Sequence, residues 1–208
     1  NSFVSLQNVS LAYGKTVAVS NLDLNVRKGE LIALLGPSGC GKTTTMRAIA
    51  GLMSLHSGSI SIDGVDMSRT PANKRGIGLV FQSYALFPHL NAFENVAFGL
   101  RIKKFSTPEI ATRVGKGLTM VGLSHLAERK PQEMSGGQQQ RLSLARSLVM
   151  EPKVLLLDEP LSNLDARLRL EMRTELQRVQ RDTGITMIFV THDQSEALAL
   201  ADRIVLMK

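Results

Sequence analysis

The chain has 208 residues, of which 43% are hydrophobic and 21% are charged. This length and composition predict one globular domain with a substantial core and room for an inserted subdomain, and they exclude intrinsic disorder as the default. The net charge is +7, but the basic residues are scattered and form no tract of five or six. The charge therefore gives no support to nucleic acid as a partner.

Residues 2–30 contain short stretches in which apolar and polar side chains alternate, with turns at Gly14 and near Gly29. Alternation of this kind predicts antiparallel strands. The segment 30–36 predicts a buried strand and 43–52 a helix. Residues 58–63 predict another strand, which ends at the Asp63-Gly64 turn, and 76–82 predict a further apolar strand.

From about residue 83 to residue 150, turn residues become rare and helical spacing dominates. Residues 154–158 then predict a buried strand. Ser162 is expected to open a helix, with Asp165 completing a capping box, and Gly184 is expected to end it. Strands are expected at 185–190 and 203–207.

Strands that alternate with helices in this way predict a mostly parallel sheet with helices on both faces. The fold class expected is therefore α/β, with an antiparallel β subdomain at the N-terminus. Residues 1–82 and 151–208 are expected to form a catalytic core, and about 83–150 an inserted helical subdomain.

Cys40 is the only cysteine, so no intrachain disulfide is possible and a reducing compartment is expected. The longest apolar runs, such as 31–35 and 154–157, are far too short to cross a bilayer. No signal peptide is recognisable at the start of the sequence.

Residues 36–43, GPSGCGKT, match the phosphate-binding pattern G-x-x-x-x-G-K-[ST] and lie between a predicted strand and a predicted helix. Glycines allow the backbone to approach an anion closely, and the N–H groups at the helix start point at it. Lys42 is expected to hold the β- and γ-phosphates of ATP, and Thr43 to coordinate Mg²⁺. The residues assigned to this phosphate loop are Gly36, Pro37, Ser38, Gly39, Cys40, Gly41, Lys42, Thr43 and Thr44.

Asp158 and Glu159 end the predicted strand 154–158. In parallel sheets, ligands bind at the carboxyl ends of the strands. Asp158 is expected to bind Mg²⁺, and Glu159 to polarise the attacking water as general base. A solvated acidic pair is the ordinary alternative, and the phosphate loop is what favours the catalytic interpretation.

The segment MSGGQQQR (134–141) resembles the LSGGQ signature of ABC ATPases, with Met134 in place of leucine. Ser135, Gly136, Gly137 and Gln138 open a second predicted helix, whose start is suited to a phosphate. The resemblance covers essentially the whole chain. It implies a P-loop NTPase fold and a head-to-tail dimer with a second copy of the chain or with a homologous ATPase. In this dimer, two ATP molecules lie between the phosphate loop of one chain and the signature of the other.

Four further residues fall where this family has functional motifs. Tyr13 matches the aromatic residue that stacks on adenine, and Gln82 matches the Q-loop residue that contacts Mg²⁺ and the reacting water. Asp165 matches the D-loop at the subunit contact, and His192 matches the switch histidine that senses the γ-phosphate. Each residue alone would be unremarkable, and a half-buried strand tyrosine competes as an interpretation of Tyr13.

Residues 84–100 and 161–169 resemble ABC importer ATPases of the group that handles sugars, polyamines, ferric iron or phosphonates. The resemblance implies separate membrane permease subunits, an indirect link to a solute-binding protein, and a peripheral position on the cytoplasmic face of the inner membrane. Members of this group usually carry a C-terminal regulatory domain, which this sequence lacks. We also expect part of the aromatic stretch 84–98 to line a groove for a short permease helix, although it could equally belong to the core.

Four alternatives remain open. A soluble ABC ATPase acting on DNA or ribosomes usually has a long coiled-coil insertion or two cassettes, and about fifty residues separate Gln82 from Met134 here. A P-loop kinase would have no use for the signature segment. A nucleotide-binding module without catalysis would not need both Glu159 and His192. An exporter ATPase is more often fused to membrane helices.

Overall fold

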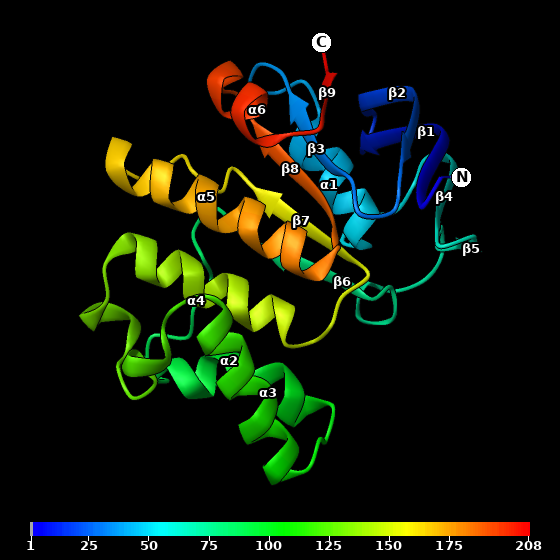
Figure 1. Ribbon diagram of the computed structural model, residues 1–208. Helices are drawn as coiled ribbons and strands as arrows, with labels where there is room; N and C mark the ends of the chain where they lie inside the picture. The colour runs from blue at the N-terminus through cyan, green and yellow to red at the C-terminus, as the bar shows by residue number, and fades with distance from the viewer. Residues whose placement is uncertain (1) are drawn as a thin grey trace.

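The computed structural model describes residues 2–208 and contains two β-sheets with helices packed around them (Figure 1). A four-stranded antiparallel sheet has the strand order β2-β1-β4-β5, and a five-stranded sheet has the order β6-β7-β8-β3-β9. Every neighbouring pair in the five-stranded sheet is parallel. The predicted α/β fold class and the N-terminal antiparallel unit are therefore confirmed.

The antiparallel sheet follows the predicted turns closely. Its strands are β1 (Val4–Tyr13), β2 (Thr16–Val26), β4 (Ser57–Ile62) and β5 (Val65–Asp66). Gly14 joins the first two strands with a φ of 58°, and Asp63 and Gly64 join the last two with φ values of 54° and 75°. Positive φ at two successive residues is the geometry that tight hairpin turns require, which explains the Asp-Gly pair.

The central strands of the parallel sheet are buried on both faces. Its strands are β3 (Leu31–Leu35), β6 (Ile77–Val80), β7 (Val154–Asp158), β8 (Thr186–Thr191) and β9 (Arg203–Leu206). Alternate residues of one strand enter different cores: Leu155 packs into one hydrophobic cluster and Leu156 into the other. This two-sided burial explains why the strands appear in the sequence as continuous apolar runs rather than as alternating ones.

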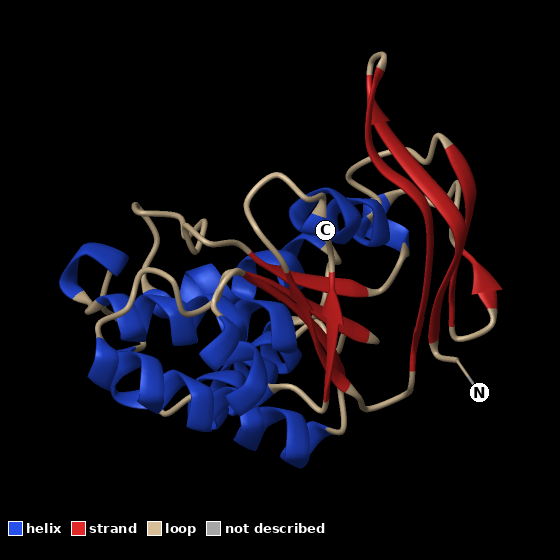
Figure 2. Cartoon of the chain, turned by 90° about the horizontal axis from the view of Figure 1, so that it is seen from above, coloured by secondary structure: helices blue, strands red, loops and turns tan. Residues whose placement is uncertain are grey.

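The helices divide between the two faces of this sheet. They are α1 (Lys42–Ala50), α2 (Ala92–Ile102), α3 (Thr107–Met120), α4 (Gly136–Leu148), α5 (Ala166–Thr183) and α6 (Gln194–Leu200). Helix α1 shares a core with the antiparallel sheet, and α2 to α6 share the other core. Figure 2 shows the antiparallel sheet on one side of the molecule and most of the helices on the other. Short 3₁₀ turns occur at Ala72–Lys74, Ser124–Leu126 and Pro131–Glu133.

Helices α2, α3 and α4 lie between β6 and β7 in the sequence and extend away from the sheet (Figure 1). This is the region in which helical spacing predicted an insertion. Across residues 2–208, no helix combines the length and the hydropathy needed to span a membrane.

One predicted helix start is wrong. Helix α5 begins at Ala166 with Asp165 as its N-cap, and the Asp165 carboxylate accepts a hydrogen bond from the Leu168 N–H at 2.9 Å. Ser162 does not cap this helix: its hydroxyl donates to the Glu159 carbonyl oxygen at 3.0 Å. Residues 160–163 form a turn, and it follows Glu159, whose φ of 44° lies outside the right-handed helical region. Gly184, with a φ of 63°, ends the helix as expected.

Candidate active site

The phosphate loop connects the end of β3 to the start of α1. Gly41 is the N-cap of α1, and with a φ of 91° and no side chain it leaves the first N–H groups of the helix without a side-chain acceptor. Lys42 is only 5% exposed, and its Nζ donates to the carbonyl oxygens of Gly36 and Pro37, both at 2.7 Å. The loop thus surrounds its own lysine, and the free N–H groups at the start of α1 are suited to an anion.

Asp158 ends β7 beside this loop. The Thr43 hydroxyl donates to the Asp158 carboxylate over a distance of 3.4 Å. Burial raises the pKa of Asp158 above its ordinary value and the charge of Glu159 raises it further, whereas Thr43, Arg47 and Lys42 act in the opposite direction. The Thr43 hydroxyl and the partly buried Asp158 carboxylate provide two hard oxygen donors. Such a pair suits a divalent cation.

Glu159 leaves the sheet in a strained conformation. Its φ of 44° is uncommon for a residue with a side chain, and its N–H is held by the Val190 carbonyl oxygen at 3.0 Å. This turn places the Glu159 carboxylate between two polar side chains. Gln82 Nε2 donates to one oxygen at 3.3 Å, and His192 Nδ1 lies 3.4 Å from the other.

Gln82 follows β6, and three bonds anchor it. Besides Glu159, its Nε2 donates to the Ser162 hydroxyl at 3.1 Å, and its own carbonyl oxygen accepts from Asn163 Nδ2 at 3.1 Å. Ser162 and Asn163 belong to the segment 162–165 that resembles the D-loop, but their contacts with Gln82 were not predicted. Their contacts join segments about eighty residues apart in the sequence, and no local pattern indicates such a contact.

Tyr13 lies at the end of β1, close to the phosphate loop. Its side chain is 52% exposed, and its hydroxyl lies 3.3 Å from the Thr44 hydroxyl. A large exposed aromatic ring beside a phosphate loop is available for stacking against a planar ligand. Cys40 contributes its backbone to the loop, and its Sγ lies 3.7 Å from Lys42 Nζ.

The signature residues form a separate helix start. Ser135 is the N-cap of α4, and it exchanges two bonds with Gln138: its hydroxyl accepts from the Gln138 N–H at 3.2 Å, and its N–H donates to Gln138 Oε1 at 2.9 Å. Gly137 packs so closely on α5 that a Cβ there would lie 3.1 Å from Leu168 Cδ2. Within residues 2–208, no hydrogen bond joins Ser135 or Gln138 to the phosphate loop.

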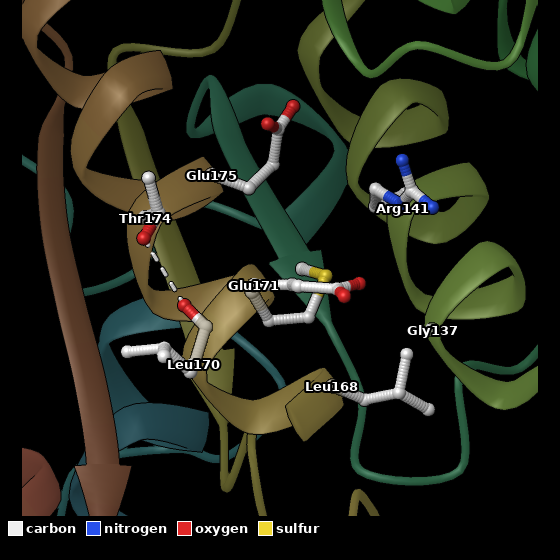
Figure 3. A pocket seen from close by; sticks show the side chains of 8 residues that line it. Gly137, Arg141, Leu168, Leu170, Glu171, Thr174 and Glu175 are labelled. Atoms are coloured by element: carbon white, nitrogen blue, oxygen red, sulfur yellow. Dashed lines mark hydrogen bonds between the residues drawn. The ribbon is translucent and has the colours of Figure 1, made fainter. Parts of the chain in front are cut away.

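A cleft of about 440 Å³ opens beside the signature between α4 and α5. Figure 3 shows Leu168 directed toward Gly137 at one end, with Glu171 and Glu175 on α5 across from Arg141 on α4. Helix α4 therefore contacts α5 at the signature, and the cleft lies next to this contact.

The loop after Gln82 is fastened to α4 by side chains that the sequence did not single out. Arg146 donates to the Ala85 carbonyl oxygen at 2.7 Å and to that of Tyr84 at 3.0 Å, and Ser143 donates to the Tyr84 carbonyl at 2.9 Å. Tyr84 and Ala85 have φ values of 63° and 50°, so two residues in an uncommon conformation are held by the signature helix.

A sequence profile described as "ABC transporter" matches residues 19–162. The spermidine/putrescine import ATP-binding protein PotA of Haemophilus influenzae is 54% identical over 205 residues, which cover 99% of this chain and 55% of the relative. The Fe(3+) ions import ATP-binding protein FbpC of Rhizobium etli is 53% identical over 205 residues, covering 99% of this chain and 58% of the relative. The chain therefore spans a little over half the length of these relatives.

Two solved structures share the fold. Clostridium perfringens cbiO1, described as part of the ABC transporter complex cbiONQ, has a TM-score of 0.93 and 33% identity, with 100% of this chain and 85% of that chain covered. A dimeric ATP-binding cassette in a post-hydrolysis state with bound ADP and Pi has a TM-score of 0.85 and 34% identity, with 99% and 94% covered.

Proposed function

The chain belongs to the ABC transporter family, and from this premise we propose that it binds and hydrolyses ATP as the motor subunit of an importer. The observation that carries the proposal is the position of Glu159. Its carboxylate lies between Gln82 and His192, at the edge of the sheet where Asp158 and the phosphate loop also meet. The import direction is supported by the relatives, which are described as import ATP-binding proteins.

The phosphate groups of ATP would bind to the phosphate loop. Lys42 would exchange its bonds with Gly36 and Pro37 for contacts with the β- and γ-phosphates, and the free N–H groups at the start of α1 would face the same oxygens. Tyr13, exposed beside Thr44, would stack on adenine.

Thr43 and Asp158, with Gln82, would hold a Mg²⁺ ion. The adjacent hydroxyl and carboxylate oxygens fit the preference of Mg²⁺ for oxygen ligands, and the raised pKa of Asp158 reflects a buried negative charge that a cation would stabilise. When bound, the ion would neutralise charge on the phosphate oxygens.

Glu159 would accept a proton from the attacking water. Gln82 would orient the water, and His192 would donate toward the γ-phosphate while keeping the Glu159 carboxylate in place. Catalysis of this type depends on positioning and charge stabilisation, and no side chain needs to bond covalently to phosphate.

A second copy would complete each site. Ser135, Gly136 and Gly137 form the start of α4, which would bind phosphate. Ser135 and Gln138 close a capping box there, and no hydrogen bond within the described chain joins them to Lys42. A head-to-tail dimer would bring this start to the γ-phosphate of the partner, and Asp165 would then lie at the contact between the copies. One structural relative is described as dimeric, which supports this arrangement.

Integral membrane permease subunits would be the mechanical partners, with a solute-binding protein linked through them, on the cytoplasmic face of the membrane. The loop after Gln82 is the surface proposed for the permease. Its Phe87 ring lies 4.4 Å from that of Phe98, which is 39% exposed, whereas Leu86 and Phe93 pack against the core. This stretch thus has both a buried and an exposed side.

The test is steady-state ATP hydrolysis by the protein and its Glu159→Gln variant. Loss of the general base should reduce turnover by roughly 10²–10⁴-fold while ATP binding is retained. Asp182→Asn, which changes an exposed carboxylate 57% accessible at the far end of α5, serves as the matched control and should behave like the parent. Near-parental turnover by Glu159→Gln would show that another group activates the water.

A further inference from the structure

A second cleft, of about 530 Å³, lies at the ends of the parallel strands opposite to the candidate active site. Lys153 and Ile185 line it, and they immediately precede β7 and β8, whereas Asp158 and Thr191 end these strands. We call it the strand-entry cleft. The ends of α4 and α5 approach the same region, beside α3 (Figure 1). The strand-entry cleft shares no residue with the candidate active site.

The floor of this cleft is apolar. Phe3, Val149 and Ile185 contribute to it, and they are 8%, 6% and 9% exposed. A cavity of several hundred Å³ with an apolar floor is of the size that holds small ligands in proteins. The floor alone would accept many apolar compounds, so selectivity has to come from the charged residues around it.

Basic side chains outnumber acidic ones around the cleft, four to two. Each acid already has a partner: Lys153 Nζ lies 3.1 Å from Asp63, and Arg113 Nη1 lies 3.2 Å from Glu151.

The remaining two cations, Lys28 and Lys116, have no ion-pair partner in the part of the chain that the structure describes. Lys28 Nζ lies 5.7 Å from the centre of the Phe3 ring. An uncompensated positive charge is therefore located directly beside the apolar floor.

We propose that the strand-entry cleft binds a small anionic amphiphile, whose apolar body covers Phe3, Val149 and Ile185 and whose carboxylate or sulfonate pairs with Lys28 and Lys116. Charge complementarity selects an anion over a cation, and the apolar floor selects an amphiphile over a simple anion. The proposal goes beyond ATP hydrolysis and does not depend on it.

A ligand bound in this cleft would affect the candidate active site through two elements. Helix α4 has the signature at its N-terminal end and Leu148 and Val149 in the cleft at the other end. Strand β7 begins directly after Lys153 of the cleft and ends at Asp158. An amphiphile that bridges α3 and the end of α4 to the start of β8 would restrain the helices relative to the sheet, so it should slow ATP turnover.

The test is calorimetric titration of the ATP-free protein with decanoate, below the concentration at which decanoate forms micelles. We expect saturable binding that weakens by up to about fourfold for each methylene removed in octanoate and hexanoate. Decyltrimethylammonium, which has the same chain with a cationic head, should bind at least tenfold more weakly. Equal binding of the two head groups, or no dependence on chain length, would overturn the proposal.

Lysine variants test whether decanoate binds in the strand-entry cleft. The double variant Lys28→Ala with Lys116→Ala should lose at least tenfold in decanoate affinity, whereas Lys15→Ala with Lys103→Ala, which removes two exposed lysines elsewhere, should bind like the parent. Charge reversal by Lys28→Glu with Lys116→Glu should make decyltrimethylammonium the better ligand. Because these lysines are exposed, the variants should fold, and circular dichroism verifies this. Unchanged decanoate affinity in the first variant would refute the assignment.

Two further outcomes are decisive. Hexaglutamate that displaces decanoate and binds more tightly would identify an acidic protein segment as the occupant and overturn the small-molecule proposal. Saturating decanoate should lower the ATPase rate at least twofold in the parent and not in the Lys28→Ala, Lys116→Ala variant; equal rates would overturn the regulatory effect. If the protein hydrolyses no ATP, the proposed function fails while the titrations still decide the binding.

Discussion

The phosphate loop offers a matched pair of glycines that separates backbone strain from steric exclusion. Gly39 and Gly41 have φ values of 85° and 91°, so alanine at either position is forced into the left-handed region. A Cβ at Gly39 would meet no atom within 4 Å, whereas a Cβ at Gly41 would lie 2.4 Å from Val19 Cγ2 and 3.1 Å from the Ala18 carbonyl oxygen.

The room available for a Cβ at each glycine determines how much each alanine variant should be destabilised. Gly39→Ala should lower the free energy of unfolding by roughly 1–2 kcal/mol, the usual cost of a left-handed conformation in a residue with a side chain. Gly41→Ala adds the cost of overpacking, roughly 1–3 kcal/mol, because Val19 is 8% exposed in β2 and its β-branched side chain has little freedom to move. The sum is about 2–5 kcal/mol.

Urea unfolding without nucleotide, followed by circular dichroism because the chain contains no tryptophan, measures both values. Binding of a fluorescent ATP analogue provides the functional measurement, and it should fail in Gly41→Ala because the start of α1 would be displaced. Equal destabilisation of the two variants would refute the reasoning, since it would show that the approach of β2 to the loop has no energetic consequence.

Three other predictions concern different parts of the site. Arg146→Lys keeps the charge but cannot span two carbonyl oxygens, so the free energy of unfolding should fall by about 1.5–3 kcal/mol. An unchanged urea midpoint would contradict the role given to Arg146. Because the pKa of Asp158 is raised in the folded state, stability without Mg²⁺ should fall as the pH rises through that pKa; Asp158→Asn should abolish this decline in urea titrations with a chelator present. Photo-cross-linkers placed at residues 84–90 should capture a membrane permease subunit in the assembled complex, and persistent failure of every position would exclude this loop as the contact.

Much of the fold follows from local patterns. The apolar runs 31–35 and 154–157 are found in buried parallel strands, and the turns at Gly14 and Asp63-Gly64 are found with the positive φ that such residues tolerate. Because functional motifs follow the strands, their meeting at one edge of the sheet was also predictable.

The remaining details depend on contacts between distant segments. Ser162 and Asp165 are both good N-cap residues, and the local pattern does not distinguish them. Tertiary structure decides, because the Ser162 hydroxyl accepts from Gln82, 80 positions earlier in the chain. The role of Arg146 could not be recognised from the sequence for the same reason, since its partners are backbone carbonyls of a loop about sixty residues away.

The most direct test of the proposed function is an ATP-dependent cross-link between two copies of the chain. After Cys40→Ser removes the native thiol, Ser38→Cys in the phosphate loop is mixed with Gly136→Cys in the signature. Gly136 is preferred to Gly137 because a Cβ there has no neighbour closer than 3.9 Å, whereas Gly137 faces Leu168. ATP together with Glu159→Gln should give a disulfide-linked product between chains that is absent without nucleotide. When both cysteines are placed in one chain, a product formed only within that chain, or one formed equally without ATP, would contradict the shared site.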